Sequence, residues 1–168
     1  MPLSDRHRRF LWIEQGVIPG VFNLVLNGAI GWALFRSLQA VPLWGQSSVG
    51  VDLLATAFLL PFLTCLIVSA LVARDVRAGR VPPLPAAQLP HSQWFRRSVS
   101  ARGLLLGLSG VLFGAAPVVW ALTLGQAEPI PFSSFVMFKA VWAALLALLV
   151  TPLIGWWALA SASHARAA

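Results

Sequence analysis

Four long apolar stretches divide the chain, at approximately 16–35, 51–73, 104–124 and 135–159. Each is about as long as the roughly 20 residues with which an α-helix crosses the hydrocarbon layer of a bilayer. Each is apolar around most of its circumference, as expected of a helix surrounded by lipid. The pattern predicts an all-α integral membrane protein with four transmembrane helices.

The first apolar stretch follows Arg6, Arg8 and Arg9, as the apolar part of a signal peptide follows its basic segment. Glu14 and Gln15 interrupt such a segment, however, and no small-residue cleavage site closes it. We therefore interpret it as the first transmembrane helix.

Arginines indicate the orientation. They precede the first helix, fill the connection between the second and third, and follow the fourth, whereas the other two connections contain only Arg36 beside a helix end, and Glu128. Because basic residues concentrate in cytoplasmic loops, we expect both termini and the central connection to be cytoplasmic.

The composition agrees with a membrane protein: 58% of the residues are hydrophobic, 10% are charged, and the mean hydropathy is +0.80. The net charge of +7 comes from clusters between apolar runs, not from a basic stripe with aromatic residues, so we expect no nucleic-acid partner. The bias toward Arg, Ala and Leu hints at a GC-rich bacterial genome and hence at the bacterial cytoplasmic (inner) membrane.

The chain matches itself at a constant offset of 87 residues. Gly16 and Gly20 fall on Gly103 and Gly107, and Gln39-Ala-Val-Pro-Leu43 falls on Gln126-Ala-Glu-Pro-Ile130. We interpret this as one helical hairpin written twice. Since each copy crosses the membrane twice, both enter from the same side, which predicts a parallel repeat with a twofold axis along the membrane normal.

The repeat divides the single transmembrane domain (1–168) into a first hairpin (10–73), a bridge rich in arginine and proline (74–102), a second hairpin (103–160) and a tail (161–168). The prolines of Val81-Pro-Pro-Leu-Pro-Ala-Ala-Gln-Leu-Pro90 favour an extended linker over a ligand for a proline-binding module. Trp94-Phe95-Arg96-Arg97 suits the headgroup layer.

Small and amide-bearing residues share one face of the first helix, and glycines occupy the matching face of the third. Glycine lets helices approach closely in lipid, so the expected packing positions are Gly16, Gly20, Gly31, Gly103, Gly107, Gly110 and Gly114. Asn23 and Asn27 lie on the same face of the first helix. They would either form interhelical hydrogen bonds or line a path for a solute.

Further polar residues form stripes on the second and fourth helices: Asp52, Thr56 and Thr64, and Lys139 and Thr151. Asp52 and Lys139 lie 87 residues apart and have opposite charges. They would either form an ion pair or each reach separately to the outer interface. Glu14 is expected to lie in the cytoplasmic interface, with proton coupling as the alternative.

The sequence indicates no catalytic residue and no cofactor. The single cysteine, Cys65, excludes an intrachain disulfide and a multi-cysteine metal site. His7, His91 and His164 fall outside the predicted helices, so we expect no haem ligand, and no enzyme motif occurs. We therefore expect no enzyme and no bound metal.

Two functions remain. The protein is either a transporter or permease with a polar intramembrane path, or a non-catalytic accessory or assembly subunit of a larger membrane complex. Because four helices enclose little space, transport would require a homodimer or another membrane protein.

Overall fold

The computed structural model describes residues 4–85, 98–125 and 129–167. It contains four long helices that could span a membrane by their length and composition, which confirms the predicted helical architecture. The interpretations of Trp94–Arg97, His91 and Glu128 lie outside the described residues, as does the second half of the proline-rich segment.

Each long helix extends beyond its apolar stretch. The first consists of α1 (Asp5–Arg9), η1 (Phe10–Val17) and α2 (Ile18–Phe35); the second is α3 (Val49–Arg77); the third consists of α4 (Val99–Ser109), η4 (Gly110–Ala115) and α5 (Ala116–Leu124); the fourth is α6 (Phe132–Ala167). Helix therefore occupies both ends of the predicted bridge. The placement of His7 and His164 outside the helices was wrong, because the polar residues that flank the apolar stretches are also helical, in α1 and in the last turns of α6.

The first and third helices each contain a π-helical segment, η1 and η4. The Ile18 N–H donates to the Ile13 carbonyl, and the Ala116 N–H donates to the Val111 carbonyl, five residues back in both cases. A proline follows closely in each helix, Pro19 and Pro117. Because proline has no N–H, it leaves a carbonyl unpaired in the preceding turn, where the wider π geometry is then easily adopted.

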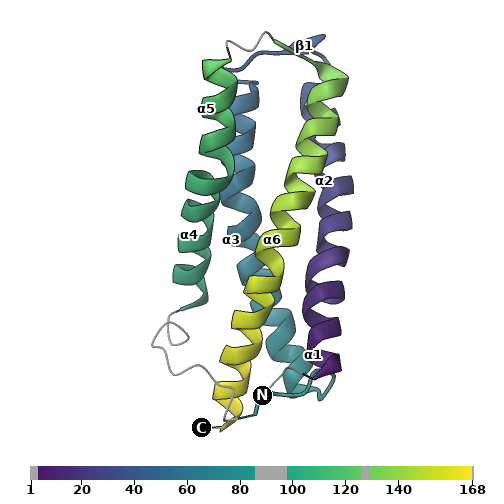
Figure 1. The fold of residues 1–168 in the computed structure, drawn as a ribbon, viewed down its shortest axis with the longest axis vertical. Coiled ribbons are helices and arrows are strands. Elements are labelled where there is room, and N and C mark those ends of the chain that lie inside the picture. The colour runs from purple at the N-terminus through teal and green to yellow at the C-terminus, as the bar shows by residue number, and fades with distance from the viewer. Residues whose placement is uncertain (1–3, 86–97, 126–128, 168) are drawn as a thin grey trace.

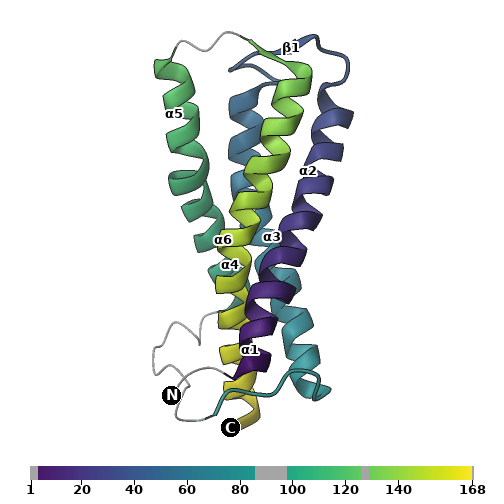
Figure 2. The ribbon, with the colours of Figure 1, turned by 45° about the vertical axis from the view of Figure 1, so that its right-hand side comes forward.

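A short ribbon that the sequence analysis did not predict joins the two outer connections. β1 (Ala40–Val41) pairs antiparallel with β2 (Ile130–Pro131), with Ala40 opposite Pro131. The ribbon lies at one end of the bundle, and α1 lies with the last turns of α6 at the other (Figures 1 and 2). We call these the ribbon end and the terminal end.

The helices are not packed as two separate hairpins. α3 and α6 pack on each other at the centre, α2 packs mainly on α6, and α4 packs mainly on α3. The two outer helices are thus each packed on a central helix of the other half of the chain (Figure 2).

The contact of the third helix with α3 is unusually close, because Pro61 frees a carbonyl within α3. Pro61 cannot donate to the Ala57 carbonyl, four residues back. A Cβ built on Gly110 would lie 2.2 Å from that oxygen, so the Gly110 Cα–H points directly at it. Gly107 and Gly103 continue the contact against Phe58 and Phe62. The glycine face of the third helix therefore packs directly on the α3 backbone and on two phenylalanine rings, with a Cα–H···O contact at its centre.

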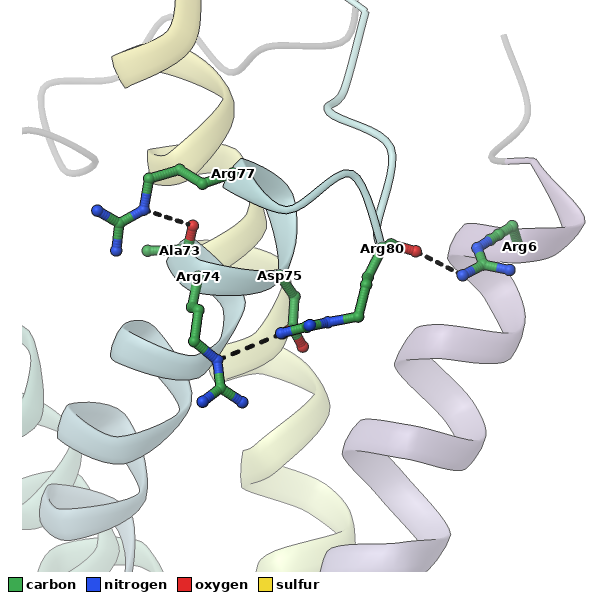
Figure 3. A network of polar contacts seen from close by, with 6 residues as sticks. All are labelled: Arg6, Ala73, Arg74, Asp75, Arg77 and Arg80. Carbon is green, nitrogen blue, oxygen red and sulfur yellow. Dashed lines mark hydrogen bonds and ion pairs between the residues drawn. The ribbon is translucent and has the colours of Figure 1, made fainter.

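The chain segment that follows α3 packs against the terminal end of the bundle and forms hydrogen bonds with it. Asp75 binds Arg80, whose carbonyl accepts from the Arg6 guanidinium (Figure 3). The His7 ring and the Pro82 carbonyl lie 2.9 Å apart, and the Leu84 N–H donates to Ser163 Oγ. Val81 and Leu84 are buried in the hydrophobic core at the terminal end. The first five residues of the proline-rich segment, Val81 to Pro85, thus belong to the folded domain.

Gly110→Ala tests the close contact between Gly110 and the Ala57 carbonyl. The added methyl group cannot coexist with the Ala57 carbonyl, so the third helix must move away. Overpacking of this kind costs about 1–3 kcal/mol, and the thermal midpoint of the purified protein in detergent should fall. The matched control is Gly114→Ala, whose Cβ would make an ordinary 3.5 Å contact with Leu146. Equal midpoints for the two variants would contradict this packing.

Candidate functional site

Lys139 and Asp52 form an ion pair between the two central helices. Asp52 lies in the first turn of α3, and Lys139 lies about two turns into α6, at the ribbon end. Their Nζ and Oδ1 atoms are 2.5 Å apart, and their side chains are 1% and 9% exposed. The ion-pair alternative is confirmed. Asp52 Oδ2 is buried with no hydrogen-bond partner among the described residues.

Burial explains why the two charges pair instead of reaching separately to water. The Lys139 side chain runs past Gly31, whose missing side chain leaves room for it: a Cβ there would lie 3.3 Å from Lys139 Cδ. Phe35 and Phe135, in edge-to-face contact, close the core above it toward the ribbon. An unpaired charge at such a site would be costly, so each of the two side chains serves as the counter-charge of the other.

Asn23 and Asn27 are buried on the face of α2 that packs on α6. The Asn23 amide donates to the Pro19 carbonyl at 2.9 Å, and the Asn27 amide donates to Asn23, at 3.2 Å to its carbonyl and 3.3 Å to its side-chain oxygen. These bonds run along the helix rather than across to α6. Interhelical hydrogen bonding was one of the two predicted roles of these asparagines. Among the described contacts, neither amide forms such a bond.

Two further polar groups lie lower on the same contact. Thr151 is fully buried on α6, and its Oγ1 has no partner among the described residues. One helical turn further on, Gly155 contacts the Gln15 side chain of η1, whose Oε1 is likewise buried without a described partner. Gly16 meets Pro152 beside them. Sequence analysis noted Gln15 only as a break in an apolar run, since burial of its oxygen depends on the tertiary contact with Gly155.

Together these residues form a column along the contact of the first helix with α6. We call it the polar seam: Lys139, Asn27, Asn23, Thr151 and Gln15. Its counterpart is the contact of the third helix with α3, where Gly103, Gly107 and Gly110 meet apolar side chains and backbone. The contact of the first helix with α6 therefore combines polar side chains with close apolar contacts, such as that of Gly20 with Leu148, whereas these glycines of the third helix meet only apolar side chains and backbone.

The remaining predicted residues lie beside the seam. Thr56 and Thr64 are half-buried on the stripe of α3 that also carries Asp52 and Leu60, and Leu60 packs against Ala143 and Ala147 of α6. Glu14 is exposed on η1 and forms no ion pair with any described residue.

The Asp52–Lys139 pair predicts strong non-additivity of mutations. Lys139→Ala leaves a buried carboxylate unpaired and should destabilise the protein by about 3–5 kcal/mol. Asp52→Ala should cost a similar amount, and the double variant should cost clearly less than the two together. Thermal unfolding in detergent measures all three. Additive losses would mean that the two charges are not coupled.

Within the described residues, no three His, Cys, Asp or Glu side chains lie together as a metal site would require. His7 bonds Ser4 and Pro82, and Cys65 is buried against the third helix. Comparison of the chain with models of known families, with curated proteins and with solved structures finds no match.

Proposed function

We propose that the protein is a small permease-like membrane protein that moves a polar solute or a proton along the polar seam. The observation that supports this most is the pair of unpartnered oxygens, Gln15 Oε1 and Thr151 Oγ1, buried on the seam at the level of η1. Buried polar groups without partners are rare in proteins, and each costs about 1–3 kcal/mol. Gln15 contacts Gly155, one helical turn after Thr151, so the two groups belong to neighbouring levels of the seam, which suits a transient polar occupant.

The neighbouring structure suits movement. η1 and Pro19 interrupt the first helix beside the two oxygens, and Pro152 interrupts α6 directly after Thr151. Segments of this kind have fewer helical hydrogen bonds to break when a helix bends. Above them, the Asn23 and Asn27 amides can exchange bonds to their own helix for bonds to a solute at little cost. The Asp52–Lys139 pair would act as the gate at the ribbon end.

We also propose that the two halves descend from a parallel repeat with a twofold axis between α3 and α6. Gly16 contacts Pro152, and the residues 87 positions away, Gly103 and Cys65, contact each other in turn. Asp52 and Lys139, which are separated by 87 residues, would lie on the axis itself. The π segments do not follow this register, since η1 ends at Val17 and η4 ends at Ala115. Their displacement would reflect later divergence.

We assign the protein to the bacterial inner membrane, with the terminal end cytoplasmic. The exposed arginines of α1 and of the end of α3 support this assignment, because they gather at the terminal end (Figure 3). The outer helices each pack mainly on one central helix and expose large apolar side chains elsewhere, so we expect a homodimer or another membrane protein to complete the path.

An accessory or assembly subunit is the second candidate. The local hydrogen bonds of Asn23 and Asn27 and the closed ion pair favour it, because they satisfy most of the seam without any solute. Such a subunit would carry no flux by itself.

Liposomes containing the purified protein test the permease proposal. The probes are protons, followed with an internal pH-sensitive dye, and glycerol and urea, followed by osmotic swelling. We expect flux of at least one probe above that of empty liposomes. Thr151→Val removes one seam hydroxyl and should lower that flux about tenfold, as expected for the loss of one hydrogen bond in a site.

The matched control is Thr123→Val on α5, whose hydroxyl only bonds the Val119 carbonyl of its own helix. This variant should keep the wild-type flux. Equal loss in both variants, or no flux of any probe through the wild-type protein, would refute the permease proposal. The second outcome would favour the accessory subunit.

The orientation predicts the behaviour of fusions. Green fluorescent protein fused to the C-terminus should fluoresce in a bacterial host, and alkaline phosphatase at the same site should be inactive, because the tail stays in the cytoplasm. Phosphatase inserted between Gly45 and Gln46, in the connection at the ribbon end, should be active. The reverse pattern would invert the proposed topology.

A further inference from the structure

Arg102 is a buried cation that the proposed function does not use. It lies in the first turn of α4 at the terminal end and is 5% exposed. Its Nη1 donates to Ser161 Oγ of α6 at 2.8 Å, and its Nε is buried with no partner. In the described part of the chain, one neutral hydroxyl is the only partner of the guanidinium, which has five N–H donors.

No carboxylate among the described residues forms an ion pair with Arg102. The chain has five Asp and Glu residues: Asp5, Glu14, Asp52, Asp75 and Glu128. Two of them pair with Lys139 or Arg80, and two are exposed on the first helix without an ion pair to any described residue. The fifth, Glu128, lies outside the described residues. Within the described residues the Arg102 guanidinium therefore has no counter-charge, and a bound anion can supply one.

We propose that Arg102 binds the phosphate group of an anionic phospholipid headgroup at the junction of α4 and α6. Burying an unpaired guanidinium is costly, whereas its planar fork matches phosphate oxygens with two parallel hydrogen bonds. The N-terminus of α4 adds a positive pole, because the dipoles of its peptide groups point that way.

The depth of Arg102 identifies the source of the phosphate. A residue in the first turn of a membrane-spanning helix lies near the headgroups, and the proposed topology puts this end in the inner leaflet, where basic pockets between helices bind anionic lipids. Ser161, which faces the guanidinium from α6, is neutral and so does not cancel its charge. Ser161 orients the fork and leaves its charge for the lipid.

Native mass spectrometry of the full-length protein in mild detergent tests this site, with phosphatidylglycerol added in increasing amounts. The wild-type protein should retain one lipid, and Arg102→Gln should weaken its retention about tenfold or more, as expected for the loss of charge-assisted hydrogen bonds. The matched control is Arg77→Gln, since Arg77 is exposed and, among the described residues, donates only to the Ala73 carbonyl of its own helix. Equal retention by wild type and Arg102→Gln would overturn the proposal.

A second variant and a second ligand complete the test. If Arg102→Gln does not fold, Arg102→Lys decides, because it keeps the charge but lacks the fork: severalfold weaker retention supports the site, and unchanged retention contradicts it. Inorganic phosphate should neither displace the lipid nor raise the thermal midpoint of the lipid-free protein. If it did both, the lipid assignment would be wrong. Solute flux is not a readout here, so this result is independent of the permease proposal.

Discussion

An ammonium group and a carboxylate, buried against each other, connect the two central helices of this protein. Apolar side chains alone hold membrane helices together without fixing their register, because lipid tails compete equally for apolar contacts. Lys139 and Asp52 remove that freedom, since separating them would leave two charges in a region of low polarity. The pair therefore fixes α6 against α3 near the ribbon end, and the outer helices pack on this central unit.

The two outer helices use their faces differently. The third helix presents glycines and lies almost on the backbone of α3, with Gly110 against the carbonyl that Pro61 frees. The first helix presents Asn23, Asn27 and Gln15 beside its glycines, so its contact with α6 is partly polar. The difference is due to a few residues, above all Asn23 and Asn27 on the first helix and Gly107 and Gly110 on the third.

Much of this architecture could be predicted from the sequence. Four long apolar runs suffice to predict four helices, because the cost of exposing polar backbone to lipid leaves few alternatives. Asp52 and Lys139 have opposite charges and are separated by 87 residues, the offset at which the chain matches itself, and this pointed to their contact. The packing order could not be predicted, since helices of similar apolarity give no indication of which neighbour each one contacts.

The buried roles of Gln15 and Arg102 were missed for a related reason. Both residues lie just before a predicted apolar stretch, where polar side chains usually reach water or headgroups, and nothing in the sequence indicates that a neighbouring helix covers them. The ribbon was also missed, because two residues in each strand leave no alternating pattern. Such features depend on tertiary contacts between distant parts of the chain.

The central claim is that the contact of the first helix with α6 is a path for polar molecules, and water access tests it most directly. In protein with Cys65 replaced by alanine, single cysteines at positions 15, 23 and 27 would be treated with a small charged thiol reagent, beside cysteines at the lipid-facing positions 22 and 25. The account predicts labelling at the three seam positions and none at the other two. Absence of labelling along the seam in folded protein would contradict it.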